Sequence, residues 1–181
     1  PYRRQRQMCI RDSRGTGYWL LLVCRLCICL VIAVQTGYDL RLAVTDEIRC
    51  REDEQKTQQL LERFAGADGG KLLQLPVVFV GYQEADLPEW CRRTEMYGWS
   101  FYGWDYSMEN PTGATHRICG FVQAYTGNVL REDATEEQKR HAVELAGQMK
   151  DFPEEGSVLV TEDCVVVRLS EVKEQMPTDW W

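Results

Sequence analysis

The strongest hydrophobic signal in the chain is a continuous apolar run at residues 18–34, which contains one charged side chain, Arg25. As a helix this run reaches about 26 Å, and its flanking residues extend it toward the roughly 30 Å of a hydrocarbon core. We therefore predict a transmembrane helix over residues 18–36, with a buried core helix as the alternative. A cation near the middle of a span is costly to insert, so Arg25 favours a helix packed among other spans.

Two further patterns follow the apolar run. An interrupted apolar stripe among charged residues predicts a helix over residues 38–66 that leaves the membrane and docks on a folded domain. Residues 75–82 then form a short valine-rich run that contains Pro76 and Gly81. Such a run is typical of a strand buried on both faces, and Pro76 fits only at its first position, where no ladder donor is needed.

The rest of the pattern alternates between helices and strands over residues 71–171. It predicts a short helix at 89–97, a strand at 99–106, helices at 114–125 and 135–149, and a hairpin of strands at 157–161 and 164–169. The predicted fold class is therefore α/β, with one transmembrane helix followed by a small α/β domain that ends in a β-hairpin. We expect residues 172–181 to form a frayed tail.

Charge changes the picture in two ways. The formal net charge of −7 argues against a nucleic-acid partner, because neutralising phosphates needs a basic surface. Residues 1–13, which hold four arginines and one aspartate, resemble the translation of a transposase adapter used to prepare sequencing libraries, and we expect them to be foreign to the protein. Without them the net charge becomes −10.

The cysteines and histidines suggest no specific chemistry. Cys24 and Cys27 have the spacing of a metal or redox pair but lie inside the apolar run, and we expect the cysteines of the domain to be buried thiols, or disulfide-bonded if the domain is extracellular. His116 follows Asp105 and Glu109, so these residues form an acid–base cluster or simply polar surface. The sequence predicts no catalytic residue, no metal site and no cofactor.

Aromatic residues are concentrated between residues 90 and 106. Aromatic side chains with a polar edge stack on sugars or lie at a membrane interface, and at alternating strand positions they fill a core. Both roles are open here. The residues that we expect to form a sugar-binding or interfacial surface are Trp99, Tyr102, Trp104 and Tyr106.

Several segments together resemble a known family. They are residues 76–82 (PVVFVGY), 115–121 (THRICGF), 149–157 (MKDFPEEGS) and 165–170 (VVVRLS). In their order and spacing they resemble the C-terminal domain of bacterial family II glucosyltransferases, which are polytopic membrane enzymes. The resemblance covers roughly residues 28–171 and includes the apolar run and the helix after it.

The resemblance implies that the chain is the last membrane span and the extracytoplasmic domain of an enzyme that transfers glucose from a polyprenyl-phosphate donor to a cell-surface polysaccharide. Its implied partners are the lipid bilayer, the lipid-linked sugar and the polysaccharide acceptor. The catalytic acidic residues would lie in loops between earlier spans, so the resemblance assigns none here. The alternative is an extracytoplasmic binding domain without catalytic activity, held by a single membrane anchor.

Overall fold

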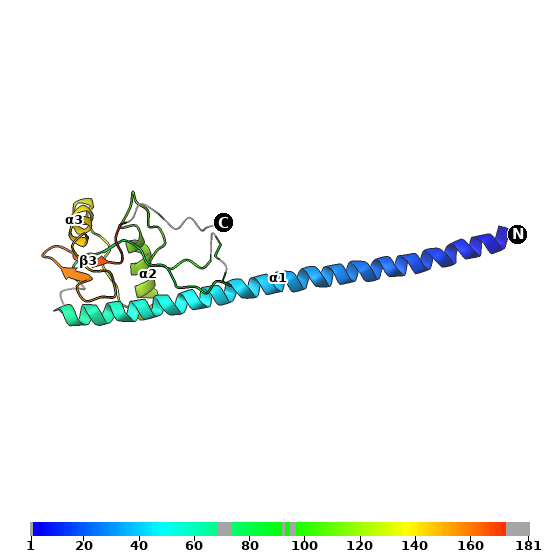
Figure 1. Ribbon diagram of the computed structural model, residues 1–181, viewed down its shortest axis with the longest axis horizontal. Coiled ribbons are helices and arrows are strands. Elements are labelled where there is room, and N and C mark those ends of the chain that lie inside the picture. The colour runs from blue at the N-terminus through cyan, green and yellow to red at the C-terminus, as the bar shows by residue number, and fades with distance from the viewer. Residues whose placement is uncertain (1, 69–73, 92, 95–96, 173–181) are drawn as a thin grey trace. The chain divides into compact units, whose positions relative to one another are not determined.

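A computed structural model describes residues 2–68, 74–91, 93–94 and 97–172, with side chains of the first helix described from Gly17 to Gly66. The elements, in chain order, are α1 (Tyr2–Asp68), β1 (Val77–Val80), α2 (Ala114–Thr126), α3 (Glu136–Ala146), β2 (Val158–Val160) and β3 (Val165–Arg168), as Figure 1 shows. The chain divides into two compact units, Pro1–Ala43 and Val44–Trp181, so that the boundary falls within α1.

The first unit is helical and exposes its apolar side chains. Trp19, Leu26 and Val31 are each more than 60% exposed, and the apolar segment of α1 is long enough to cross a membrane. It is the only such helix among the described residues. The predicted helices at 18–36 and 38–66 are one uninterrupted helix, and an added Cβ at Gly37 would meet nothing within 4 Å.

The second unit contains a three-stranded mixed sheet in the order β1-β3-β2. The central strand β3 pairs in parallel with β1, where Val77 lies opposite Val165, and antiparallel with β2, where Val158 lies opposite Val167. The hydroxyl of Thr161, in the short loop between β2 and β3, donates to the carbonyl of Cys164. The hairpin and the α/β character of the domain were both predicted.

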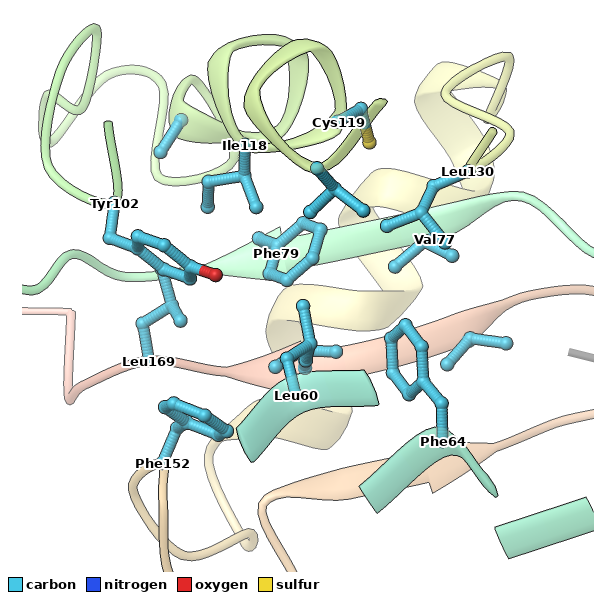
Figure 2. Packing of buried hydrophobic residues seen from close by; sticks show 14 residues of the cluster. Leu60, Phe64, Val77, Phe79, Tyr102, Ile118, Cys119, Leu130, Phe152 and Leu169 are labelled. Carbon is cyan, nitrogen blue, oxygen red and sulfur yellow. The ribbon is translucent and has the colours of Figure 1, made fainter. Parts of the chain in front are cut away.

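Apolar layers cover both faces of the sheet, as the continuous apolar character of β1 predicts. On one face, Phe79 and Val77 pack with Leu60 and Phe64 of α1 and with residues of α2, as Figure 2 shows. On the other face, Val78 and Val80 pack against α3. All four residues of β1 are fully buried, which is why this strand carries no polar position.

The two short helices begin and end at residues with clear local roles. Thr135 caps α3: its hydroxyl accepts from the backbone N–H of Gln138, whose side chain accepts in turn from the backbone N–H of Thr135. This capping box was predicted from the sequence. Helix α2 is capped at its C-terminus by Gly127, which has a left-handed φ of 77°, a conformation that glycine adopts without strain.

Two predicted elements are absent from the structure. The described residues between 89 and 97 form turns and irregular backbone rather than a helix, with the N–H of Cys91 bonded to the carbonyl of Pro88. Residues 99–106 form turns rather than a strand, because the carbonyl of Ser100 accepts from the N–H groups of Gly103 and Trp104. The predicted tail lies almost entirely outside the described residues.

Candidate functional site

The four aromatic residues singled out from the sequence do not share one surface. Tyr102 is fully buried and Tyr106 is 3% exposed, so both rings pack in the core. Trp99 and Trp104 are partly exposed. The expected aromatic surface is therefore reduced to these two tryptophans, because the segment folds as a compact turn that points its tyrosines inward.

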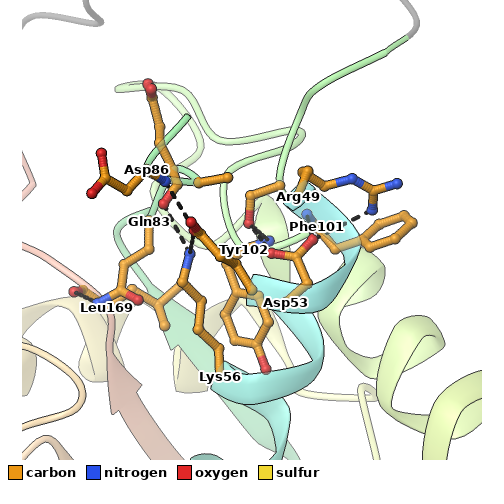
Figure 3. A network of polar contacts seen from close by, with 12 residues as sticks. Arg49, Asp53, Lys56, Gln83, Asp86, Phe101, Tyr102 and Leu169 are labelled. Carbon is orange, nitrogen blue, oxygen red and sulfur yellow. Dashed lines mark hydrogen bonds and ion pairs between the residues drawn. The ribbon is translucent and has the colours of Figure 1, made fainter. Parts of the chain in front are cut away.

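A buried carboxylate on α1 holds this turn in place. Asp53 has a fully buried side chain, which accepts hydrogen bonds from the Ser100 hydroxyl at 2.6 Å and from the Phe101 N–H at 3.0 Å. Arg49 donates to the same carboxylate at 3.4 Å, as Figure 3 shows. Burial raises the pKa of Asp53, while these hydrogen bonds and the charges of Lys56 and Arg49 lower it. The network fixes the turn to the helix.

Further contacts extend this attachment toward the sheet. The Tyr102 hydroxyl lies 2.9 Å from that of Thr57, and Lys56 donates to the carbonyl of Glu84 at 2.8 Å. Burial lowers the pKa of Lys56, and the charges of Asp53, Glu52 and Glu84 oppose this. The side chain of Gln83 donates to the carbonyl of Leu169, just after β3. These buried and partly buried polar groups bond to one another or to backbone carbonyls, which indicates a structural role.

Helix α2 places different side chains on three faces. Residues 114, 115, 118 and 122 face the core, and the Thr115 hydroxyl is bonded to the backbone of Phe79. A second face carries Phe121 and Tyr125, whose rings stack 6.0 Å apart. A third face, with residues 116, 119, 120 and 123, lines a cleft.

The second face completes a row of stacked aromatic rings. Phe101 stacks on Phe121 with ring centroids 4.7 Å apart and lies 6.2 Å from Trp104. The guanidinium groups of Arg49 and Arg117 lie over Phe101 and Trp104, at 4.8 Å and 5.0 Å from the ring centroids. The ring faces of Phe101 and Trp104 are therefore already in contact with neighbouring side chains. Helical spacing alone would place Phe121 in the core, so the sequence pattern does not indicate its part in this row of rings.

The third face forms one wall of a cleft of about 360 Å³, and the segment after α2 forms the other. Its lining residues are His116, Cys119, Gly120, Gln123, Val129, Leu130, Arg131, Glu132 and Asp133. In this cleft the His116 Nδ1 lies 2.8 Å from the Glu132 carboxylate. Burial, together with the charge of Glu132, raises the pKa of Cys119 to about 12, so this thiol is protonated and a poor nucleophile.

The acid–base cluster suggested by the sequence is not assembled. His116 pairs with Glu132 from the other wall of the cleft, whereas Asp105 accepts a hydrogen bond from Arg117 at 2.7 Å. Among the described residues, no group of three or more histidine, cysteine, aspartate or glutamate side chains could hold a metal ion. The cysteines from Cys24 to Cys164 are free thiols.

Comparison of the chain with protein families, curated proteins and solved structures finds no match.

Proposed function

We propose that the chain is the C-terminal part of a membrane glucosyltransferase. In this proposal the apolar segment of α1 is the last membrane span, and the second unit is an extracytoplasmic domain that carries no catalytic residue. The enzyme transfers glucose from a polyprenyl-phosphate donor to a cell-surface polysaccharide.

One observation carries the membrane part of the proposal. The apolar window of α1 is long enough to span a bilayer and has none of its residues buried within the protein. A soluble protein buries such a segment, since leaving it in water forgoes about 25 cal/mol for each Å² of apolar surface. Arg25 is the one charged residue of the apolar run, and it supports a helix packed beside other spans, where the guanidinium finds a partner.

The arrangement of the segments that resemble family II glucosyltransferases supports the rest. Val77–Val80 pairs in parallel with Val165–Arg168, although the two strands are far apart in the chain. Thr115 of another such segment exchanges hydrogen bonds with the backbone of Phe79. Residues of the segments on which the proposed resemblance rests thus pack in one core rather than lying in scattered stretches.

The topology is tested by labelling. In a bacterium that expresses the full chain, Asn128→Cys introduces an exposed thiol, which a membrane-impermeant maleimide labels in intact cells if the domain is extracytoplasmic. The unsubstituted chain is the matched control for labelling of native cysteines. Labelling of the introduced thiol only after the cells are lysed would contradict the proposed orientation, and recovery of the chain in the alkaline-soluble fraction would contradict the span.

The proposed enzymatic identity is tested by sequencing the gene upstream of the codon for residue 14. We expect a continuous frame that encodes further apolar spans with acidic residues in the loops between them. The full-length product is expected to transfer radiolabelled glucose from polyprenyl-phosphate glucose to cell-surface polysaccharide. A start codon close upstream, followed by a single apolar span, would overturn the glucosyltransferase proposal.

A domain held by a single span and specialised for binding is the second candidate. The observation that favours it is the open cleft beside α2, in a unit with its own apolar core. In that case the chain binds a ligand, and no longer gene product that contains it transfers glucose. The frame upstream of residue 14 and the transfer assay distinguish the two candidates.

A further inference from the structure

The cleft beside α2 has a feature that the fold does not require. Gly120 lies in the interior of this 13-residue helix, where glycine destabilises the helix relative to alanine. A Cβ atom added there would meet no atom within 4 Å, so no close neighbour demands a glycine. Gly120 lines the cleft. A glycine at such a place lets a ligand approach the helix backbone closely.

The lining of the cleft indicates a hydrophilic ligand. Most of its side chains end in flat polar groups: His116, Gln123, Arg131, Glu132 and Asp133. The Gln123 amide presents two hydrogen-bonding atoms side by side, and the Glu132 carboxylate has a second oxygen beside the one that contacts His116, which suits the neighbouring hydroxyl groups of a sugar ring. Val129, which is 59% exposed at the cleft, offers an apolar contact for the C–H groups of the same ring. The volume of about 360 Å³ is at the small end of ligand sites.

Charge decides between a neutral and a phosphorylated sugar. Arg131 is the only lysine or arginine among the residues that line the cleft, and its guanidinium is already engaged. It binds both carboxylate oxygens of Asp133, at 3.0 and 2.5 Å, and donates to the carbonyl of Gln74 at 2.6 Å. The Glu132 carboxylate, 46% exposed, adds a negative charge. A phosphate would therefore be repelled.

From these observations we propose that the cleft between α2 and residues 129–133 binds a neutral hexose unit of the polysaccharide acceptor, with the ring against Gly120. The inference rests on the proposed glucosyltransferase function for the identity of the acceptor. It assigns the domain a role in holding the acceptor chain. The lipid-linked donor, which carries a phosphate, binds elsewhere.

Two substitutions at one position form the test. Gly120→Trp places a large side chain in the cleft, where its Cβ meets no neighbouring atom, whereas Gly120→Ala leaves the cleft open and favours the helix. The full chain in detergent micelles is titrated with methyl α-D-glucopyranoside, methyl α-D-galactopyranoside and methyl α-D-mannopyranoside, and binding is followed by saturation-transfer NMR. Glucose 1-phosphate is the anionic probe.

We expect millimolar binding of at least one neutral glycoside. Gly120→Trp is expected to weaken it by about tenfold or more, because the ring is excluded, and Gly120→Ala to leave it within about twofold. Gln123→Ala, which removes a side chain without filling the cleft, is expected to weaken binding and keeps the test valid if Gly120→Trp does not fold. Unchanged binding in Gly120→Trp, no binding of any glycoside, or preferential binding of glucose 1-phosphate would each overturn the inference.

A second measurement separates this inference from the proposed function. In cells with the full-length protein, Gly120→Trp is expected to raise the KM for the polysaccharide acceptor with the KM for the lipid-linked donor unchanged. Glucose transfer that is unaffected by Gly120→Trp would overturn the acceptor site and leave the enzyme standing. Glycoside binding in the cleft without any glucose transfer would overturn the enzyme and leave a sugar-binding domain.

Discussion

Removing the buried carboxylate of Asp53 is expected to destabilise the second unit severely. Asp53→Ala leaves the Ser100 hydroxyl and the Phe101 N–H without their acceptor, and both donors bond to Asp53 at 3.0 Å or less. Each buried donor that loses its partner costs about 1–3 kcal/mol. Arg49 keeps its 2.6 Å bond to Asp46, so its loss is smaller.

For the two donors the sum is about 2–6 kcal/mol, a range that includes the cost of breaking a buried ion pair. Domains of this size have free energies of unfolding of about 5–15 kcal/mol, so the Asp53→Ala variant would be marginally stable. Asp53→Asn is expected to lower the free energy of unfolding by about 1–2 kcal/mol, because its amide oxygen still accepts from one of the two donors.

The assay is urea unfolding of the full chain in detergent micelles, followed by tryptophan fluorescence. Glu47→Gln is the matched control, since it removes a carboxylate of the same helix that pairs with Arg51 at an exposed site. That pair is worth at most about 0.5 kcal/mol, so the control should unfold like the wild type. A free energy of unfolding for Asp53→Ala within about 1 kcal/mol of the wild type would refute the reasoning.

Three further predictions follow from the same structure. Burial raises the pKa of Asp53 above 3.8 in the folded protein, so the folded state binds the proton of this carboxyl more tightly than the unfolded state does, and the stability that this contributes is lost as the pH rises from 3.8 through the folded pKa. In urea unfolding at several pH values, the difference in free energy of unfolding between wild type and Asp53→Asn should therefore narrow over that range. A difference that widens would contradict this prediction. Thr135→Ala removes the capping hydroxyl of α3 and should lower the free energy of unfolding by about 1 kcal/mol in urea, with Thr135→Ser as the control that retains the cap; equal losses in both would contradict the capping role. Arg25→Leu should favour insertion of the apolar segment by about 3 kcal/mol in a glycosylation-reporter assay, whereas Arg41→Leu, outside that segment, should have little effect, and equal shifts would contradict a span centred near Arg25.

Elements with a strong local pattern were predicted well. The valine-rich run gave β1 because a short, wholly apolar segment closed by Gly81 suits a strand covered on both faces. The capping box at Thr135 predicted the start of α3, since both of its hydrogen bonds join residues three apart. Its predicted end at residue 149 was too late, because the helix stops at Ala146 and turns follow.

The segment at 99–106 was mispredicted for a physical reason. Aromatic composition favours strands, but that preference reflects burial on a pleated surface rather than a backbone requirement. Here burial is supplied by α1, whose Asp53 bonds the turn at Ser100 from 47 positions earlier in the chain. A contact of that range leaves no signal in the local pattern.

The sequence alone determined helices α2 and α3, the fully buried strand β1, and that one stretch is apolar enough to cross a membrane. These properties depend on residues within a few positions of one another, whose periodicity and caps are readable directly. Only the tertiary structure decided that Tyr102 and Tyr106 are buried, that His116 pairs with Glu132, and that the cleft opens beside Gly120. Each of these is set by how distant segments pack, because burial and pairing belong to the assembled core rather than to any stretch of chain.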